Sequence, residues 1–359
     1  NDDAVTLSTN GTGPLAALIF KTSADPFVGK LSYLRVYDGI LKSDSQLWNA
    51  NHGESERVGQ VYTITGKSQK AVSELLTGDI DAVAKLSSTL TSDTLSERDN
   101  PLLLTGIEFP NPVYNKAVYP KSSADLDKMT SALARIGEED PSLTISREPN
   151  TLELLLGGLG DSHLEVAVEK MKRKLGVEIV LEEPKVPYKE TIKSVAKVEY
   201  RHKKQSGGHG QFGHVWLEIQ PLPRGTDFKF EQKVVGGSVP REYIPSVEKG
   251  VRSALSNGVL AGYPVVDLKV TLVDGSFHPV DSSGICFEIA GSHALAKGVQ
   301  EAHPSLLEPI MQVTVTVPDN YTGDLIGDLN SKRAKILSMT PQGNGITLIE
   351  VEAPQAEML

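Results

Sequence analysis

The stretch from Gly157 to Gly176, GGLGDSHLEVAVEKMKRKLG, decides the fold of the middle of the chain. Its apolar residues recur at helical spacing and are Leu164, Val168, Met171 and Leu175. Ser162 with Glu165 three residues later forms a capping box, which predicts the start of a helix. Gly176 predicts the end of that helix, because glycine adopts the left-handed backbone of a helix terminus at little cost. The glycines before Ser162 predict a tight turn from a strand into the helix, or alternatively a cradle for an anion.

The segments on either side of this helix complete a regular alternation of strands and helices. A strand-like run at Leu102–Glu108 and a Pro-bracketed run at Val113–Val118 together supply the first β segment. They are followed by a predicted helix between Ser122 and Pro141, a hairpin of Leu143–Ser146 and Leu152–Leu156, and a strand at Val177–Leu181. Together with the central helix they give the order βαββαβ over about 80 residues, which is the ferredoxin-like pattern.

The residues before this unit are strand-like and lack a helical period. The β-rich runs are Leu15–Phe20, Leu31–Tyr37, Val58–Ile64 and Asp81–Leu86. Short strands at this spacing, separated by turn signals such as Asp38-Gly39, predict a small β-barrel or sandwich. The polar stretch Ser92–Pro101 predicts a linker to the next unit.

Two further units with both strands and helices follow Glu183. In the first, extended segments surround a glycine-rich stretch. Its later predicted elements are a strand at Phe228–Val235, a helix from Val247 to Asn257-Gly258, a strand at Val265–Val273, and a helix from Ser282 to Val299 with Ile285, Ile289 and Leu295 as its apolar stripe. The second has the order βαββ, with elements predicted at Met311–Val317, Tyr321–Lys335, Ile336–Thr340 and Ile346–Val351. A ferredoxin-like unit has a second helix and a fourth strand, so the last domain is expected to be partial.

The sequence therefore predicts a multidomain α+β fold. A β-barrel is followed by a ferredoxin-like α/β sandwich, a split α/β domain with a crossover, and a partial ferredoxin-like domain. The predicted boundaries are 1–98, 99–183, 184–306 and 307–359.

Charge and cysteine content exclude several classes of protein. The formal charge is −10, so a basic surface over the whole chain, as expected for a DNA-coating protein, is absent. A single cysteine, Cys286, excludes an internal disulfide or a paired-cysteine motif, and its position beside Ile289 predicts core packing. No apolar run approaches the ~20 residues of a membrane span, and no signal peptide is recognisable, so a cytoplasmic location is expected.

Residues Gly208 to Gly213 match the letters of the dinucleotide motif GxGxxG but lack its context. That motif opens a helix whose N-terminus meets the phosphates, whereas Val215–Ile219 alternates like a strand. We therefore reject a nucleotide-binding role for this loop.

The same glycine-rich loop lies in a basic part of an acidic chain. From Lys185 to His214 seven Lys and Arg residues stand against only Glu190 and Glu199, a local charge of +5. Glycine backbone can approach a polyanion closely while basic side chains neutralise phosphates, which favours a nucleic-acid contact. A solvated strand with a flexible loop is the alternative interpretation.

No residue set for breaking a covalent bond is recognisable in the sequence. The patterns GxxxxGK[ST], GxSxG and HExxH do not occur. His202, His209 and His214 lack the short spacings of zinc ligands and have no neighbouring cysteine. We expect neither a catalytic nor a metal site, and no bound cofactor, in this chain.

Several stretches resemble a known family. They are DPFVGKL (25–31), LARIGEEDP (133–141), GLGDSHLE (158–165), YKETI (188–192), SGGHGQFGHV (206–215), DSS (281–283), LEPIM (307–311) and GDLIGDLN (323–330). The first resembles the barrel of translational GTPases, and the others resemble, in order, the third, fourth and fifth domains of translation elongation factor G. The chain is similar to domains II to V of that family without the GTPase domain.

This resemblance implies a ribosome-binding protein that promotes tRNA–mRNA translocation and whose fourth domain enters the decoding site. The implied contacts with the codon–anticodon region lie in two tip loops, at Ser206, Gly207, Gly208, His209, Gly210, Gln211 and His278. The implied basic contacts with rRNA are Lys197, Arg201, Lys203, Lys204, Lys332 and Arg333. GTP with Mg²⁺ is expected on the GTPase domain, not on this chain. The expected partners are rRNA, tRNA and mRNA of the ribosome, with no membrane or DNA, and the chain is expected to be a monomer and not itself an enzyme.

Other functions remain open at this point. A ribosome recycling factor or a ribosome-protection protein has the same architecture as elongation factor G. A phosphate-binding enzyme that uses the Gly207–Gly213 loop is an alternative of a different class, and a purely structural scaffold is a third.

Overall fold

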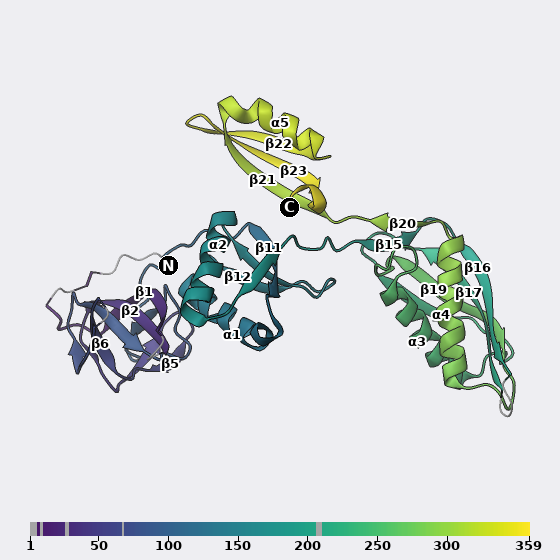
Figure 1. Ribbon diagram of the computed structural model, residues 1–359, viewed down its shortest axis with the longest axis horizontal. Helices are drawn as coiled ribbons and strands as arrows, with labels where there is room; N and C mark the ends of the chain where they lie inside the picture. The colour runs from purple at the N-terminus through teal and green to yellow at the C-terminus, as the bar shows by residue number, and fades with distance from the viewer. Residues whose placement is uncertain (1–5, 8–9, 26–28, 67, 206–209) are drawn as a thin grey trace. The chain divides into compact units, whose positions relative to one another are not determined.

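The computed structural model describes residues 6–7, 10–25, 29–66, 68–205 and 210–359. The chain divides into two compact units, residues 1–185 and residues 186–358, and each is described by itself. Figure 1 shows the elements of both units, and the fold is the predicted multidomain α+β class.

The first part of the chain is an antiparallel β structure around one apolar core. Its strands are β1 (Ala16–Asp25), β2 (Gly29–Asp38), β3 (Leu41–Lys42), β4 (Gln46–Asn49), β5 (Glu54–Arg57), β6 (Val61–Thr65), β7 (Ser68–Val72), β8 (Glu74–Leu75), β9 (Ile80–Ala84) and β10 (Thr94–Ser96). Eight of them form a sheet in the order β5-β4-β10-β1-β2-β9-β6-β7, and β3 pairs with β8. The predicted linker Ser92–Pro101 is wrong in part, because β10 lies within it, is fully buried and pairs with β1 and β4.

A buried carboxylate fastens one loop of this barrel. Glu56 on β5 is 1% exposed and accepts hydrogen bonds of 2.8–3.0 Å from the backbone N–H and hydroxyl groups of Ser87, Ser88 and Thr89. Burial raises the pKa of Glu56, but these hydrogen bonds favour the charged form more strongly and lower the pKa to about 2.

We expect the barrel to lose stability in acid through Glu56. The folded pKa lies below the ordinary value of 4.5, so this stabilisation is complete above pH 4.5 and is lost as the pH falls towards 2. The expected loss is on the order of 2 kcal/mol. The chain has two tryptophans, and Trp48 on β4 reports barrel unfolding by fluorescence once Trp216 is replaced by phenylalanine. Glu56→Gln should remove the acid dependence, whereas the exposed neighbour Glu54→Gln should leave it; an unchanged pH profile in Glu56→Gln contradicts the assignment.

The second part of the chain is the predicted ferredoxin-like sandwich. Its elements are β11 (Tyr114–Pro120), α1 (Ser123–Glu139), β12 (Thr144–Arg147), β13 (Leu154–Gly158), α2 (Asp161–Lys170), the π-helix η1 (Met171–Leu175) and β14 (Ile179–Glu182). The antiparallel sheet has the order β12-β13-β11-β14, and the helices bury the apolar residues that the periodicity predicts against it. Gly176 ends η1 with φ 64°, which confirms the predicted helix stop.

Two predicted details of this domain are wrong. Leu102–Glu108 is not a strand, because its backbone is held by side chains: Leu104 N–H donates to Thr94 Oγ1 and Ile107 N–H to Ser92 Oγ. Helix α2 starts one residue before Ser162, since the first intrahelical bond runs from Leu164 N–H to Gly160 O, so Ser162 is not its cap.

The third part, which we call the tip domain, is a four-stranded sheet with two helices. Its elements are β15 (Lys189–Ile192), β16 (Ala196–Lys204), β17 (Gln211–Pro221), β18 (Phe228–Gln232), η2 (Arg241–Tyr243), α3 (Ile244–Asn257), β19 (Leu268–Ser276), α4 (Gly284–Glu301) and β20 (Pro304–Leu307). The sheet order is β16-β17-β19-β18, and β18 and β19 are parallel, joined through α3 in the predicted crossover. A separate pair, β15 with β20, closes the domain at the end where the chain enters and leaves (Figure 1).

The start of α4 differs from the prediction. Ser283 and not Ser282 caps the helix, and its hydroxyl accepts from Cys286 N–H. The hydroxyl of Ser282 instead donates a hydrogen bond to Phe212 O, and Ser282 lies before the first residue of α4. Ile285 is 69% exposed and does not join the core, whereas Cys286 is 2% exposed, as predicted.

The last part is the predicted βαββ unit. Its elements are β21 (Ile310–Pro318), η3 (Asp319–Tyr321), α5 (Thr322–Ser331), β22 (Lys335–Gly343), β23 (Ile346–Pro354) and η4 (Gln355–Glu357), with the sheet order β21-β23-β22. The helix is shorter than predicted, because Arg333 has φ 56° and turns the chain into β22.

Candidate nucleic-acid interface

The described residues that flank the first predicted tip loop lie beside the second loop at one end of the tip domain. One loop joins β16 to β17, and the other joins β19 to α4 (Figure 1). Four predicted residues of the first loop, Ser206, Gly207, Gly208 and His209, lie outside the described residues. Gly210 and Gln211 are described, and Gln211 pairs with Lys204 in the ladder that runs along the whole length of β16.

Asp281 joins the second loop to the first. Its carboxylate accepts from Gly210 N–H at 3.0 Å, and its carbonyl accepts from Phe212 N–H at 2.8 Å. The Ser282 hydroxyl adds a bond of 2.9 Å to Phe212 O. Residues separated by about 70 positions in sequence are thereby held together, so both loops present one composite surface.

His278 is fixed within its loop by one ring nitrogen. Nδ1 accepts from Val280 N–H at 3.3 Å and from Asp281 N–H at 3.1 Å, and the backbone N–H of His278 donates to Ser282 Oγ at 2.9 Å. Because Nδ1 accepts, the neutral ring carries its proton on Nε2. The ring is about half exposed and tilted against Phe212, with centroids 6.4 Å apart. His278 therefore offers a donor at the tip.

Gln211 is positioned by a histidine that the sequence analysis did not assign. Gln211 Oε1 lies 2.9 Å from Nε2 of His202, which is buried on β16. This contact leaves the amide nitrogen of Gln211, an exposed residue, as the donor available to a partner. The alternation of β16 could have indicated a buried His202, but not its bond to Gln211.

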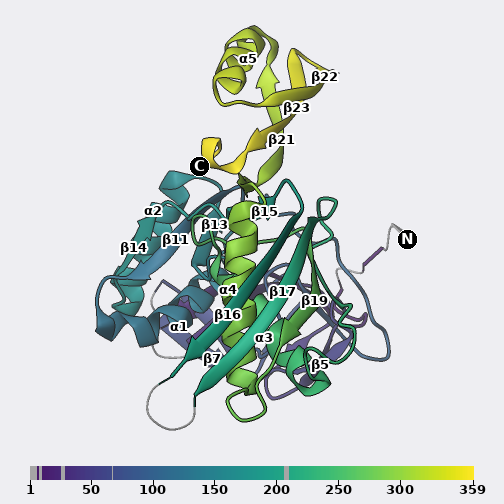
Figure 2. The same cartoon turned by 90° about the vertical axis from the view of Figure 1, so that its right-hand side faces the viewer.

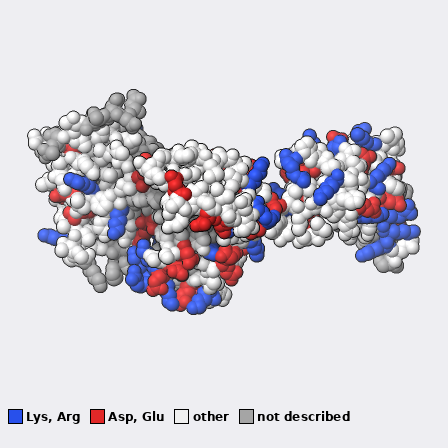
Figure 3. Space-filling model, turned by 90° about the horizontal axis from the view of Figure 1, so that it is seen from above, with Lys and Arg blue, Asp and Glu red and all other residues white. Residues whose placement is uncertain are grey.

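The predicted basic residues Lys197, Arg201, Lys203 and Lys204 are all exposed on β16. Figure 3 shows Lys and Arg gathered at this end of the tip domain. The segment from Lys185 to His214 has two acidic residues, Glu190 and Glu199. Glu190 is fully buried and contributes no charge to the surface. Glu199 is bonded to Nε2 of His214 at 3.1 Å. Of the seven cations counted in the sequence, four therefore lie exposed on β16, with Glu199 as the acidic residue of the same strand.

The two other predicted basic residues lie in the last domain. Arg333 forms ion pairs with Glu308 at 2.8 Å and Glu357 at 3.1 Å, which raise the pKa of the guanidinium. Lys332 lies 3.9 Å from Asp328. The ion pairs of Arg333 connect the two ends of the last domain. A contact of Lys332 and Arg333 with rRNA stays a prediction.

The described residues were compared with the side-chain pattern of a metal site and with the context of the GxGxxG motif. No cluster of His, Cys, Asp and Glu suited to a metal occurs among them. The GxGxxG letters lead into strand β17, as predicted, so no helix N-terminus follows this loop. None of the helices in the described ranges combines the length and apolar composition needed to cross a bilayer.

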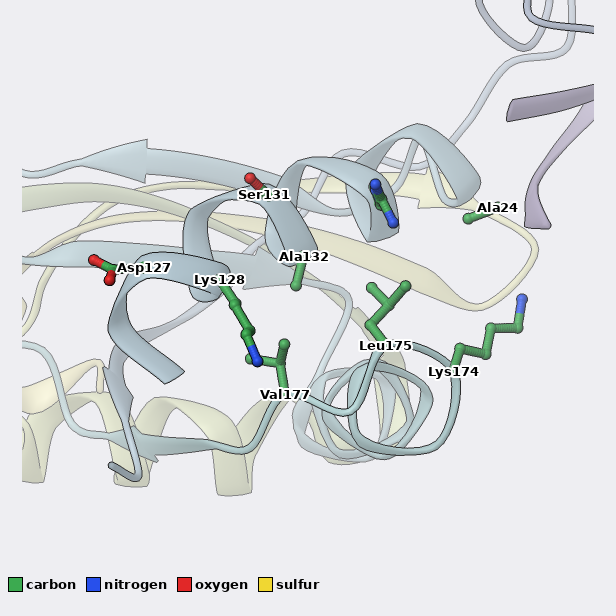
Figure 4. A pocket seen from close by; sticks show the side chains of 9 residues that line it. Ala24, Asp127, Lys128, Ser131, Ala132, Lys174, Leu175 and Val177 are labelled. Carbon is green, nitrogen blue, oxygen red and sulfur yellow. The ribbon is translucent and has the colours of Figure 1, made fainter. Parts of the chain in front are cut away.

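A groove of about 420 Å³ lies between α1 and η1 (Figure 4). It is lined by Ala24, Asp127, Lys128, Ser131, Ala132, Arg135, Lys174, Leu175 and Val177. Glu139 binds both Lys174 Nζ, at 2.9 Å, and the backbone N–H of Ala24 on β1. The groove therefore lies next to the contact between β1 of the barrel and α1 of the second domain.

Comparison with known proteins places these domains in one family. Four family models match in chain order: elongation factor G domain 2 over residues 14–98, domain III over 109–183, domain IV over 184–303 and the elongation factor G C-terminus over 305–359. A crystal structure of a protein from Thermus thermophilus is 39% identical, with a TM-score of 0.79, and the match covers 96% of this chain and 52% of that chain. The chain thus spans about half the length of that protein. Because consecutive matches to one family account for almost all of the described fold, the chain belongs to the elongation factor G family.

Proposed function

We propose that this chain is the ribosome-binding portion of a translational GTPase that promotes tRNA–mRNA translocation in the cytoplasm. The observation that carries the proposal is the composite tip surface, in which Asp281 fastens the β19–α4 loop to the start of β17 beside a basic edge strand. Such a surface suits a ribonucleoprotein groove lined with phosphates.

The chain's own residues have separate tasks in this proposal. Lys and Arg side chains of β16 neutralise rRNA phosphates and hold the domain in its groove. The Gln211 amide and His278 Nε2 donate hydrogen bonds to the backbones of tRNA and mRNA, while the composite surface fills the space that they vacate. Hydrolysis of GTP, assisted by Mg²⁺, would supply the energy in a whole protein that carries the GTPase domain.

Binding assays separate this proposal from its alternatives. The chain should co-sediment with ribosomes but bind neither ATP nor GTP in equilibrium dialysis. Nucleotide binding would favour the phosphate-binding enzyme, and failure to co-sediment would contradict ribosome binding. Co-sedimentation with split subunits but not with tRNA-loaded ribosomes would favour a recycling role.

The tip assignment predicts a specific loss of translocation. Gln211→Ala with His278→Ala, in the protein that carries its GTPase domain, should slow translocation about tenfold or more, because two hydrogen bonds to RNA are lost. Lys249→Gln is the matched control, since Lys249 is 72% exposed on α3, outside the tip loops. Stopped-flow measurement of mRNA movement gives the rates. Equal rates in the double variant and the control would disprove the tip assignment.

A further inference from the structure

The sheet of the tip domain has one covered and one open face. Helices α3 and α4 pack on one side, and the other side faces the viewer in Figure 2. Alternate residues of each strand point to opposite faces, so those between the buried positions of β16 and β17 form the open face. This face is a surface distinct from the tip loops.

An aromatic side chain lies on this open face. Trp216 on β17 stands between the buried Val215 and Leu217, and it is itself only half-buried. Lys197 Nζ lies over its ring, 5.8 Å from the centroid. A flat ring that accepts a cation from solvent also offers its face to a nucleic-acid base.

A row of cations follows the neighbouring edge strand. Lys197, Arg201 and Lys203 alternate along β16 and are exposed. Phe212 lies opposite Lys203 in the ladder, so a second, half-buried aromatic ring stands at the tip end of the row.

The acidic residues closest to Trp216 are already engaged. Glu199, opposite Trp216 on β16, is bonded to His214 at 3.1 Å. Asp274, opposite Trp216 on β19, accepts from Ser238 Oγ at 2.7 Å and from Gly275 N–H at 2.8 Å. These bonds satisfy part of both carboxylates, and Lys197, Arg201 and Lys203 present their charges on the same face.

We propose that this open face, centred on Trp216, binds single-stranded RNA. An unpaired base displaces the Lys197 ammonium group from the indole face and stacks there, and Lys197 and Arg201 then hold the flanking phosphates. A four-stranded sheet with exposed aromatics and basic neighbours suits unstacked bases, whereas a double helix keeps its bases from such a ring. The choice of RNA as the ligand rests on the proposed function.

Tryptophan fluorescence tests this proposal directly in the full chain. Trp48→Phe leaves Trp216 as the sole tryptophan, and a short single-stranded RNA should quench its emission on stacking. Lys197→Gln with Arg201→Gln should weaken the measured affinity about tenfold, whereas Lys249→Gln on α3 should leave it unchanged. Absence of quenching, or equal quenching by duplex RNA, would overturn the proposal.

A labelled RNA provides a second measurement that does not depend on tryptophan emission. By fluorescence anisotropy, Trp216→Leu should bind about tenfold more weakly, and Trp216→Phe should retain most of the affinity because it keeps a ring. Equal affinity of Trp216→Leu and the parent chain would overturn the proposal. Ribosome co-sedimentation distinguishes failure of this inference from failure of the proposed function. If the chain binds ribosomes but Trp216 does not respond to RNA, the proposed function stands and this inference fails. If Trp216 responds to RNA but the chain does not bind ribosomes, this inference stands and the proposed function fails.

Discussion

Replacement of Glu190 by alanine is expected to unfold the tip domain at markedly lower denaturant concentration. The Glu190 side chain is fully buried, and its carboxylate accepts from the backbone N–H groups of Val259, Leu260, Ala261 and Tyr263 at 2.7–3.1 Å. Burial raises the pKa of Glu190, but the four hydrogen bonds lower it by a larger amount. The pKa therefore lies below its ordinary value, and the carboxylate is charged in the folded protein at neutral pH. Its removal leaves four donors without an acceptor, at an expected cost of about 4 kcal/mol.

Urea unfolding followed by Trp216 fluorescence, in the Trp48→Phe background, measures this loss within the tip domain. Glu199→Ala is the matched control, because that carboxylate is 47% exposed and is bonded to one histidine; it should cost less than about 1 kcal/mol, the worth of one surface pair. Similar midpoints for Glu190→Ala and Glu199→Ala would show that the four bonds do not hold the 259–263 loop.

The second large effect is expected at the crossing of the two helices of the tip domain. A Cβ added to Gly250 on α3 would lie 1.9 Å from the backbone oxygen of Glu288 on α4, and one added to Gly291 would lie 2.7 Å from Val247 O. Backbone atoms cannot move aside as a flexible side chain can, so Gly250→Ala must separate the helices. The expected cost is about 3 kcal/mol, although alanine favours the helix itself.

Ser253→Ala on the exposed face of α3 controls for the helix propensity of alanine. It should be neutral or slightly stabilising in the same urea titration, while Gly250→Ala should also reduce ribosome binding as the tip domain loosens. A midpoint for Gly250→Ala that matches that of Ser253→Ala would contradict the close helix contact.

Local pattern was sufficient for much of the fold. The helical spacing between Leu164 and Leu175, with its stop at Gly176, and the strand alternation around it predicted the βαββαβ unit, apart from its first strand at Leu102–Glu108. The errors arose where a partner distant in sequence decided the outcome. Thr94–Ser96 reads as a polar linker, yet it is a buried strand because β1 and β4 lie on either side of it.

In the candidate site, too, the contacts between residues distant in sequence could not be predicted. The resemblance to elongation factor G implied that Gln211 and His278 belong to one tip, but the link through Asp281 could not be derived from spacing. His202 and Trp216 were not assigned, because a lone histidine or tryptophan in a strand has no distinctive pattern.

The sequence by itself therefore determined the element order, the helix stops at Gly176 and Gly258 and the basic character of the tip segment, since these depend on neighbouring residues in the chain. Only the tertiary structure decided where each charge lies. It buries Glu190 under the backbone of residues 259–263, leaves the cations of β16 exposed, and places Trp216 on the open face of its sheet. The physical reason is that burial and hydrogen-bond partners come from segments about 70 or more residues away, which one-dimensional periodicity does not record.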